Sequence, residues 1–288
     1  MTSTQTYSGP KRGFVLSPHG NIEYMEMGSG PPLILLHQTA ISAAEYDGAL
    51  PLLKDEVRAI AMSTMGFGQS DTPPYPYTTL HEFAQCVIWL MDGLGLEKAS
   101  VFGTHTGSTI AVEVAAGWPE RVDKLIIEEC FNWNTPERRA VHERLHRYYP
   151  EKPDGSHLIE LWEKAGGTRE GADLEKVRSR FMDNFRVNHM SHGAEEIYGP
   201  TGWEGSATYG MCRYEMWDAT PKVKAPTLVI HGTKSQLGRS HEKFLETIPR
   251  SKGWRPESNN NFTWYSMGPE GAQQWKKAVL DFLRDPGI

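Results

Sequence analysis

One short stretch of the sequence combines a reactive side chain with the features of a sharp turn. The apolar pair Val101-Phe102 is followed by Gly103-Thr-His-Thr-Gly107 and then by small residues that suit a helix. This layout is typical of a nucleophile elbow, a tight strand-to-helix turn that presents one reactive side chain at the start of a helix. The glycines fit because such a turn leaves no room for neighbouring side chains. The apex residue is His105, where such turns usually carry Ser, Cys or Asp.

A histidine at this apex can act as a general base or as a nucleophile. Imidazole titrates near neutral pH and can therefore accept and return protons. The positive end of the helix dipole favours the neutral base form. Ser108, just past the apex, is expected to hydrogen-bond back to a carbonyl instead of reacting. The alternative is that His105 only makes hydrogen bonds inside a protein that binds a ligand without chemistry; the retained turn around a titratable residue favours catalysis.

Two other histidine pairs have spacings that would place both rings on one side of a helix. These are His142 with His146, and His189 with His192. Neither pair belongs to a recognisable metal-ligand signature. The glycine-containing turn at 28–32 does not match a phosphate-binding loop. We therefore expect no metal and no other cofactor.

The elbow is embedded in an alternation of predicted strands and helices. The predicted strands are a hairpin at 13–27 and the apolar runs 33–36, 57–62, 99–102, 124–127 and 227–231. The predicted helices are 45–53, 79–94, 107–117, 240–248 and 272–283, with a capping box at 79–82. Continuous apolar strands that alternate with helices predict an α/β fold, in which helices cover both faces of a mostly parallel central sheet.

Residues 131–220 break this alternation. They are rich in charged and aromatic residues, include helical stretches and contain no clear buried strand. We interpret them as a helical lid over the carboxyl ends of the strands, where open α/β sheets bind ligands. The core domain then comprises 1–130 and 221–288. Aromatic residues of the lid, Trp133 among them, predict a pocket for a small hydrophobic or aromatic substrate.

Composition excludes several other classes of partner. The formal net charge of −6 leaves no basic surplus for binding nucleic acid. No apolar run is long enough to span a bilayer, and we expect no membrane association. The first residues are polar and lack the apolar core of a signal peptide. Three scattered cysteines indicate a reducing compartment, with the cytoplasm as the expected location. The sequence leaves a homodimer open.

In this order and spacing, the motifs resemble the α/β-hydrolase superfamily over nearly the whole chain. The matching features are the strand 33–37 that enters an oxyanion loop, the glycine-rich loop 65–71, the elbow, and the segments 119–122 and 226–232. Each is weak alone, and their combination is strong. The resemblance implies the α/β-hydrolase fold with its helical lid.

The resemblance also reveals that all three positions of the family's catalytic triad are changed. His105 occupies the nucleophile position. The acid is expected three residues after Gly232, where Ser235 stands, and the histidine is expected before the last helix, where Asn261 or Asn260 stands. A serine nucleophile needs a histidine base and an orienting carboxylate. A conventional serine esterase is therefore not expected.

In some members of the family the acid comes from the end of the strand after the elbow. That strand ends in Glu128-Glu129, and strand alternation points only one of the two towards the pocket. We favour Glu129 as the residue that orients His105.

The oxyanion loop and its surroundings supply the remaining candidates. The backbone N–H groups of Thr106 and Thr39 would stabilise an oxyanion, and the side-chain amide of Gln38 is an alternative donor. His37 is more often a residue that fixes this loop. Asn261 could bind substrate or a water molecule, or lie in a solvated turn.

These observations lead to two competing functions. The first is an atypical, cofactor-free enzyme in which His105 acts as general base or nucleophile on a small-to-medium hydrophobic carbonyl compound, ester or lactone. Hydrolysis, C–C or C–X bond cleavage, proton abstraction and isomerisation all fit this site. The second is a ligand-binding protein of the same fold without catalysis. A carboxylate within hydrogen-bond reach of the His105 ring would favour the enzyme.

Overall fold

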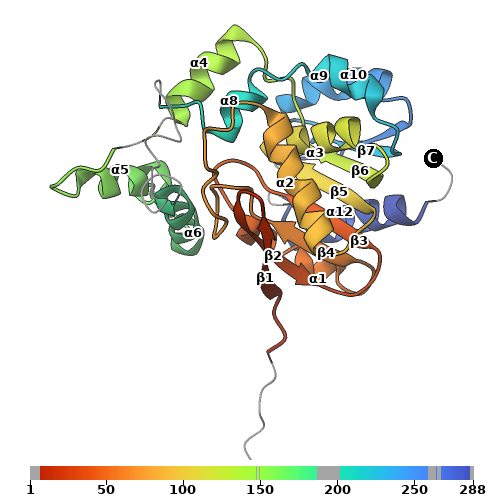
Figure 1. Ribbon diagram of the computed structural model, residues 1–288, viewed down its shortest axis with the longest axis horizontal. Coiled ribbons are helices and arrows are strands. Elements are labelled where there is room, and N and C mark those ends of the chain that lie inside the picture. Colours follow the sequence, from red (N-terminus) through yellow and green to blue (C-terminus); the bar gives the residue numbers. More distant parts are fainter. Residues whose placement is uncertain are drawn as a thin grey trace, which may run out of the picture.

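Eight strands form one central sheet in the computed structural model (Figure 1). The strands are β1 (Lys11–Ser17), β2 (Gly20–Met27), β3 (Pro32–Leu36), β4 (Arg58–Met62), β5 (Ala99–Thr104), β6 (Val122–Glu128), β7 (Thr227–Ile230) and β8 (Ser251–Trp254). Their order is β1-β2-β4-β3-β5-β6-β7-β8. The β1–β2 and β2–β4 pairs are antiparallel, and all other neighbours are parallel. The structure describes residues 7–146, 148, 150–186, 202–258, 264 and 267–285.

Helices cover both faces of this sheet (Figure 1). The helices of the described residues are η1 (Ala43–Tyr46), α1 (Leu50–Leu53), α2 (Leu80–Gly93), α3 (Thr106–Gly117), α4 (Pro136–Leu145), α5 (Ser156–Lys164), α6 (Leu174–Phe185), α8 (Ala207–Met211), α9 (Met216–Ala219), η3 (Thr220–Lys222), η4 (Leu237–Ser240), α10 (His241–Thr247) and α12 (Gly268–Arg284). No helix in the described ranges combines the length and the apolar character that crossing a membrane requires.

Alternation along the strands divides the interior into two apolar clusters. Ile34 of β3 and Val101 of β5 pack with α2 and α3 on one face. Their neighbours Leu35 and Phe102 pack with α1 and α12 on the other face. Because successive side chains of a strand point to opposite faces, strands buried on both sides must be apolar throughout. The predicted mostly parallel sheet with helices on both faces is confirmed.

The predicted strands and helices are present, with ends that differ by a few residues, and the structure adds the strand β8. The capping box at 79–82 is present at the start of α2. The helix predicted at 45–53 is instead two short helices, η1 and α1. Gly48 lies between them, and Pro51 is the second residue of α1. Proline lacks a backbone N–H and is tolerated in the first turn of a helix, so it starts a new helix rather than continuing one.

In the described parts of the segment between β6 and β7, the regular elements are all helices, joined by loops. Its last part joins the main interior, because Met211 of α8 and Met216 of α9 belong to the apolar cluster of α2 and α3. Helices α5 and α6 pack on each other and lie together at one side of the molecule (Figure 1). The role of 131–220 as a lid stays a prediction.

Two contacts attach the end of α6 to the core. Arg186 donates a hydrogen bond from Nη1 to the carbonyl oxygen of Gly68, 3.1 Å away. Asp183 lies near enough to Ser42 for this neighbour to lower the pKa of its carboxyl, while burial, the larger effect, raises that pKa to about 7. Ser42 and Gly68 lie in the loops after β3 and β4. Helix α6 is therefore held against the carboxyl ends of the strands, where the sequence predicts the ligand site.

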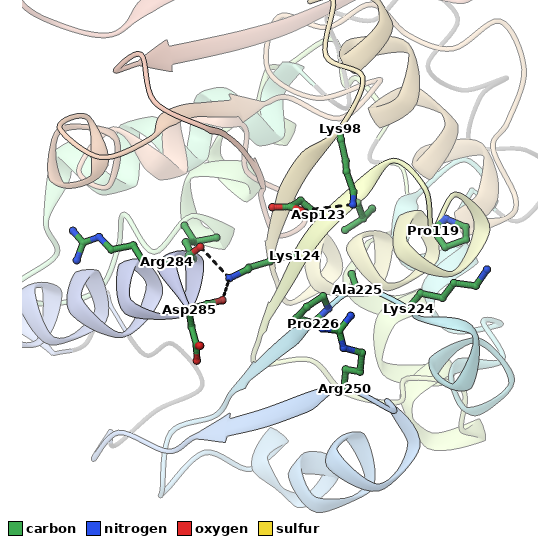
Figure 2. Close-up of a pocket in the computed structure, with 12 residues that line it drawn as sticks. Lys98, Pro119, Asp123, Lys124, Lys224, Ala225, Pro226, Arg250, Arg284 and Asp285 are labelled. Carbon is green, nitrogen blue, oxygen red and sulfur yellow. Dashed lines mark hydrogen bonds and ion pairs between the residues drawn. The ribbon is translucent and has the colours of Figure 1, made fainter. Parts of the chain in front are cut away.

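At the amino ends of the strands, Lys124 of β6 binds the end of α12 (Figure 2). Its Nζ donates hydrogen bonds to the carbonyl oxygens of Phe282 (2.8 Å), Leu283 (3.0 Å) and Asp285 (2.5 Å). The last carbonyl groups of a helix have no partner within the helix, and a cationic side chain can satisfy them. A cavity of about 440 Å³ lies beside this contact, far along the strands from His105.

Lys124→Met should lower the free energy of unfolding by about 1–3 kcal/mol, because the helix end loses hydrogen bonds to a charged donor. Chemical denaturation measures the change. The matched control is Lys98→Met in the same cavity, where the lysine is 3.6 Å from the exposed Asp123. An exposed pair contributes little, so this control should change stability by less than about 0.5 kcal/mol. Equal stability of wild type and Lys124→Met would contradict this role of Lys124.

Candidate functional site

His105 lies at the apex of the turn between β5 and α3, in a backbone conformation that residues with a side chain rarely adopt. Its φ is 47° and its ψ is −115°. The flanking glycines are required by close approach. A Cβ on Gly107 would lie 2.1 Å from the carbonyl oxygen of Leu36, and a Cβ on Gly103 would lie 2.2 Å from the carbonyl oxygen of Gly107. Strain of this kind costs about 1–3 kcal/mol and concentrates at functional sites. The turn has the geometry that the glycine spacing predicts.

The backbone of His105 is fixed on both sides. Its N–H donates to the carbonyl oxygen of Glu128 at 3.1 Å, which joins the elbow to the end of β6. Its own carbonyl oxygen accepts a hydrogen bond from the hydroxyl of Ser108 at 2.5 Å. The backward hydrogen bond predicted for Ser108 is therefore present, and the hydroxyl is occupied. The apex stays in place because both neighbours hold its peptide groups.

The ring of His105 lies beside Trp133, which is the centre of a group of aromatic and basic side chains. The two rings stack at 28° with centroids 6.4 Å apart. Trp133 also meets the edges of Phe131 at 5.4 Å and His142 at 4.9 Å. The guanidinium of Arg138 lies over the rings of Phe131 and Trp133, at 5.0 and 5.4 Å from their centroids. Trp133 therefore lies next to His105, together with Arg138, which sequence analysis did not single out. The role of Trp133 in a substrate pocket stays a prediction.

The i,i+4 histidines of α4 do lie side by side. The rings of His142 and His146 stack with centroids 5.3 Å apart. Burial, helped by the positive charge of Arg138, lowers the pKa of His142 to about 4, and burial lowers the pKa of His146 to about 3. Both rings are therefore neutral at neutral pH. Among the described residues no group of three or more His, Cys, Asp or Glu side chains could hold a metal. His189 and His192 lie outside the described residues.

The two predicted oxyanion donors lie next to each other. The N–H of Thr39 donates to Oγ1 of Thr106 at 3.4 Å. Thr106 begins α3, so its own N–H belongs to the first turn and has no acceptor within the helix. The alternative donor, Gln38, is held elsewhere. Its backbone N–H and its Nε2 each donate to the carboxylate of Glu45 at 2.8 Å. The bond of Thr39 is long and lies within the predicted donor pair, whereas both donors of Gln38 are bound firmly to Glu45. The oxyanion role of Thr39 and Thr106 stays a prediction.

His37 connects the loops after β3 and β4. Its Nε2 accepts a hydrogen bond from the N–H of Thr64 at 3.0 Å, so Nδ1 carries the proton and donates to the carbonyl oxygen of Gln38 at 2.8 Å. Burial lowers the pKa of His37 to about 4, which keeps the ring neutral. Both ring nitrogens are used within the protein, and His37 fixes the oxyanion loop. Asn261, the remaining candidate, lies outside the described residues.

Glu129 follows β6 directly, and its carboxylate is bound by the loop after β7. Its φ is 51°. One carboxylate oxygen accepts from the N–H of Gly232 at 2.7 Å, and the other accepts from the hydroxyl of Ser235. Burial raises the pKa of Glu129, and these two hydrogen bonds oppose the rise. Within the described part of the chain no hydrogen bond joins this carboxylate to the ring of His105. The structure brings Glu129 close to the elbow in the fold but pairs it with Ser235.

Glu128 is a buried carboxyl without a partner. Its side chain is 1% exposed, and neither carboxyl oxygen has a hydrogen-bond partner within the described ranges. Burial, together with the charges of Glu129 and Glu45, raises the pKa of Glu128 well above its usual value of 4.5. The group is therefore a neutral acid in the folded protein. Its backbone supports His105, but its side chain makes no described contact with the histidine ring.

Comparisons with known proteins agree on one family. A family model described as "alpha/beta hydrolase fold" matches residues 31–259. A haloalkane dehalogenase from Mycobacterium marinum is 27% identical over 271 residues, which cover 90% of this chain and 88% of that protein. The 2-hydroxy-6-oxo-6-(2'-aminophenyl)hexa-2,4-dienoic acid hydrolase from Metapseudomonas resinovorans is 26% identical over 251 residues, 82% of this chain and 80% of that protein.

A solved structure extends this similarity to three dimensions. The enol-lactonase from Burkholderia xenovorans superposes with a TM-score of 0.68 at 20% identity, and the match covers 95% of this chain and 100% of that one. At this identity the superposition describes the fold alone. Together with the matched family model it confirms the fold class predicted from the motifs.

Glu128→Met should stabilise the protein by about 1–3 kcal/mol at neutral pH, because it removes an unpaired buried polar group. The gain should grow as pH rises from about 4 to 8, because the carboxyl ionises in the unfolded chain but stays protonated in the folded one, so rising pH favours unfolding of the wild type. Denaturation at several pH values measures this. A stability gain that does not change with pH would contradict the raised pKa.

The control for this experiment is Glu120→Gln, which changes an exposed carboxyl. This variant should stay within about 0.5 kcal/mol of the wild type at every pH, as is usual for surface substitutions.

Proposed function

The chain belongs to the α/β-hydrolase fold family, and from that premise we propose that it is an enzyme in which His105 acts as general base on a small carbonyl, ester or lactone compound. The observation that carries this proposal is the position of His105 at the strained apex, with φ 47°, beside the N–H groups of Thr39 and Thr106. A titratable residue held in strain beside convergent donors is what acyl chemistry requires.

The proposed reaction for an ester or lactone needs only these groups. Neutral imidazole takes a proton from a water molecule while the water oxygen attacks the carbonyl carbon. The carbonyl oxygen becomes an oxyanion that the N–H groups of Thr39 and Thr106 stabilise. When the intermediate collapses, the bond to the leaving alcohol breaks, and the imidazolium of His105 returns its proton to the alkoxide. Water is consumed, and the acid and the alcohol are released.

This reaction proceeds without a catalytic triad. The carboxylate of Glu129 is already bound by Gly232 and Ser235, so it does not orient the His105 ring in the described structure. Imidazole needs no activation by a carboxylate to act as a base near neutral pH. The ring of Trp133 stacks on the His105 ring and restricts its movement on that side. The proposal therefore assigns Glu129 a role in joining the strand ends.

The names of the relatives support hydrolysis over isomerisation. They describe a haloalkane dehalogenase, a dienoic acid hydrolase and an enol-lactonase, each of which acts on a small organic molecule. We propose that this chain likewise hydrolyses a small substrate.

A second candidate is a ligand-binding protein without catalysis. The observation that favours it is the pairing of Glu129 with Ser235, the residue at the expected acid position. If Glu129 only joins the strand ends and His105 does not act as a base, the fold still provides a site that can bind a ligand. This candidate predicts saturable binding of a small ligand without turnover.

His105→Gln and His105→Ala should each lower kcat/KM for short-chain aryl esters and lactones by about 10²–10⁴-fold, the usual contribution of a general base. The wild-type rate should also fall below neutral pH, because a protonated imidazole cannot accept a proton. Initial rates across a substrate panel measure both effects.

The control is His81→Gln, because His81 is exposed and paired with Glu113 on the surface. This variant should hydrolyse the same substrates at the wild-type rate. Unchanged turnover in both His105 variants would show that the proposed base is wrong. Saturable binding with no product after long incubation would instead identify the second candidate.

A further inference from the structure

Arg138 carries a charge for which the described residues provide no counter-ion. Within the described chain its guanidinium makes no ion pair, and its side chain is half-buried. Its close neighbours are the rings of Phe131 and Trp133. Aromatic faces attract a cation but do not neutralise it. A guanidinium fixed in this way retains its planar set of donors for a carboxylate, which it binds with two parallel hydrogen bonds.

The indole N–H of Trp133 is a second donor without an acceptor. Trp133 is only 6% exposed, and its Nε1 has no hydrogen-bond partner among the residues that the structure describes. Indole nitrogen can only donate. Leaving a buried donor unpaired costs about 1–3 kcal/mol, and folded proteins contain few such groups. An oxygen atom of a bound ligand would remove this cost.

Both donors border the same ring that His105 touches. The ring of Trp133 stacks on His105 at 6.4 Å and lies under Arg138 at 5.4 Å. The cation, the indole N–H and the proposed base are therefore all within reach of one side chain. The contacts bring one charged group, one neutral donor and one base to a single aromatic side chain.

The surrounding charge also favours an anion, although the whole chain is acidic. Burial raises the pKa of the Cys212 thiol to about 12, and Arg213, Arg139 and Arg138 all oppose this rise. Burial lowers the pKa of His142, and the charge of Arg138 is the second cause of this lowering. The positive charges therefore shift the pKa values of two separate groups, His142 of α4 and Cys212 after α8.

We propose that the substrate is an organic acid whose carboxylate binds Arg138 and Nε1 of Trp133, with its apolar or aromatic frame against Trp133 and Phe131. This inference rests on the proposed function, because it assumes that the group next to the bound carboxylate is the one that His105 attacks through water. The carboxylate binds without reacting. Arg138 is a specificity-determining residue, and it distinguishes acids from neutral compounds of the same shape.

The test compares trans-cinnamate with cinnamamide, which share one planar frame and differ in charge. Isothermal titration calorimetry of the full chain at neutral pH measures both affinities. Wild type should bind cinnamate at least about tenfold more tightly than cinnamamide, as expected for a charge-assisted pair. Arg138→Met should abolish this preference by weakening cinnamate alone. Arg138→Lys should keep part of it, because it retains the charge but not the two parallel donors.

Arg139→Met is the matched control. Arg139 is the next residue on α4, and its Nε donates to the carbonyl oxygen of Cys212 at 3.0 Å. This variant should keep the preference for cinnamate. Trp133→Phe keeps an aromatic ring but removes the indole N–H, and it should weaken cinnamate binding about five- to tenfold, the value of one hydrogen bond to a charged group. Unfolding midpoints close to that of wild type confirm that the variants are folded.

Three results would overturn the inference. These are no cinnamate binding at millimolar concentration, equal affinity for both probes in wild type, and a preference that survives in Arg138→Met, as binding in the cavity beside Lys124 would produce. The proposed function is tested separately with His105→Gln, which should bind cinnamate as wild type does while lacking turnover. If turnover persists in His105→Gln while the preference still depends on Arg138, the base is wrong and the carboxylate site stands.

Discussion

The close approach of α3 to the end of β3 is the constraint on which the site depends. The helix begins so near the strand that a Cβ on Gly107 would lie 2.1 Å from the carbonyl oxygen of Leu36. This approach sets Thr106 beside the loop that carries Thr39, and it leaves His105 at a φ of 47°. The arrangement is made by backbone atoms and small residues. It is therefore independent of which side chain occupies the apex, and the same turn can present a histidine as readily as a serine.

The residues that replace the rest of the triad form a consistent group of their own. Glu129 and Ser235 come from the ends of adjacent strands, and the hydroxyl donates to the carboxylate. A second carboxylate at position 235 would face Glu129 at the same short distance, and two like charges there would repel. The hydroxyl of Ser235 avoids this repulsion and joins the loop after β7 to the end of β6. The presence of Glu129 thus explains the serine at position 235.

Sequence patterns could predict the elbow and the sheet because both follow from local requirements. The glycine spacing records a steric need, and the apolar runs record burial on both faces. The choice between Glu128 and Glu129 rested on strand alternation, which assumes an extended backbone. Glu129 lies one residue beyond the end of β6 and has a φ of 51°, so strand alternation does not apply to its side chain. The grouping of Arg138 with Trp133 depends on the path of the chain after β6, and no local pattern encodes that path.

The attachment of α12 has a consequence for how the chain reaches its native state during synthesis. Trp275 and Val279 of α12 share an apolar cluster with Leu33 and Leu35 of β3. Lys124 of β6 holds the end of the same helix. Helix α1 covers part of this face early. The ribosome produces β3 long before α12, so the part that α12 covers stays exposed through most of translation. Nascent chains of this protein therefore expose an apolar surface of the kind that chaperones recognise, and only the arrival of α12 hides it.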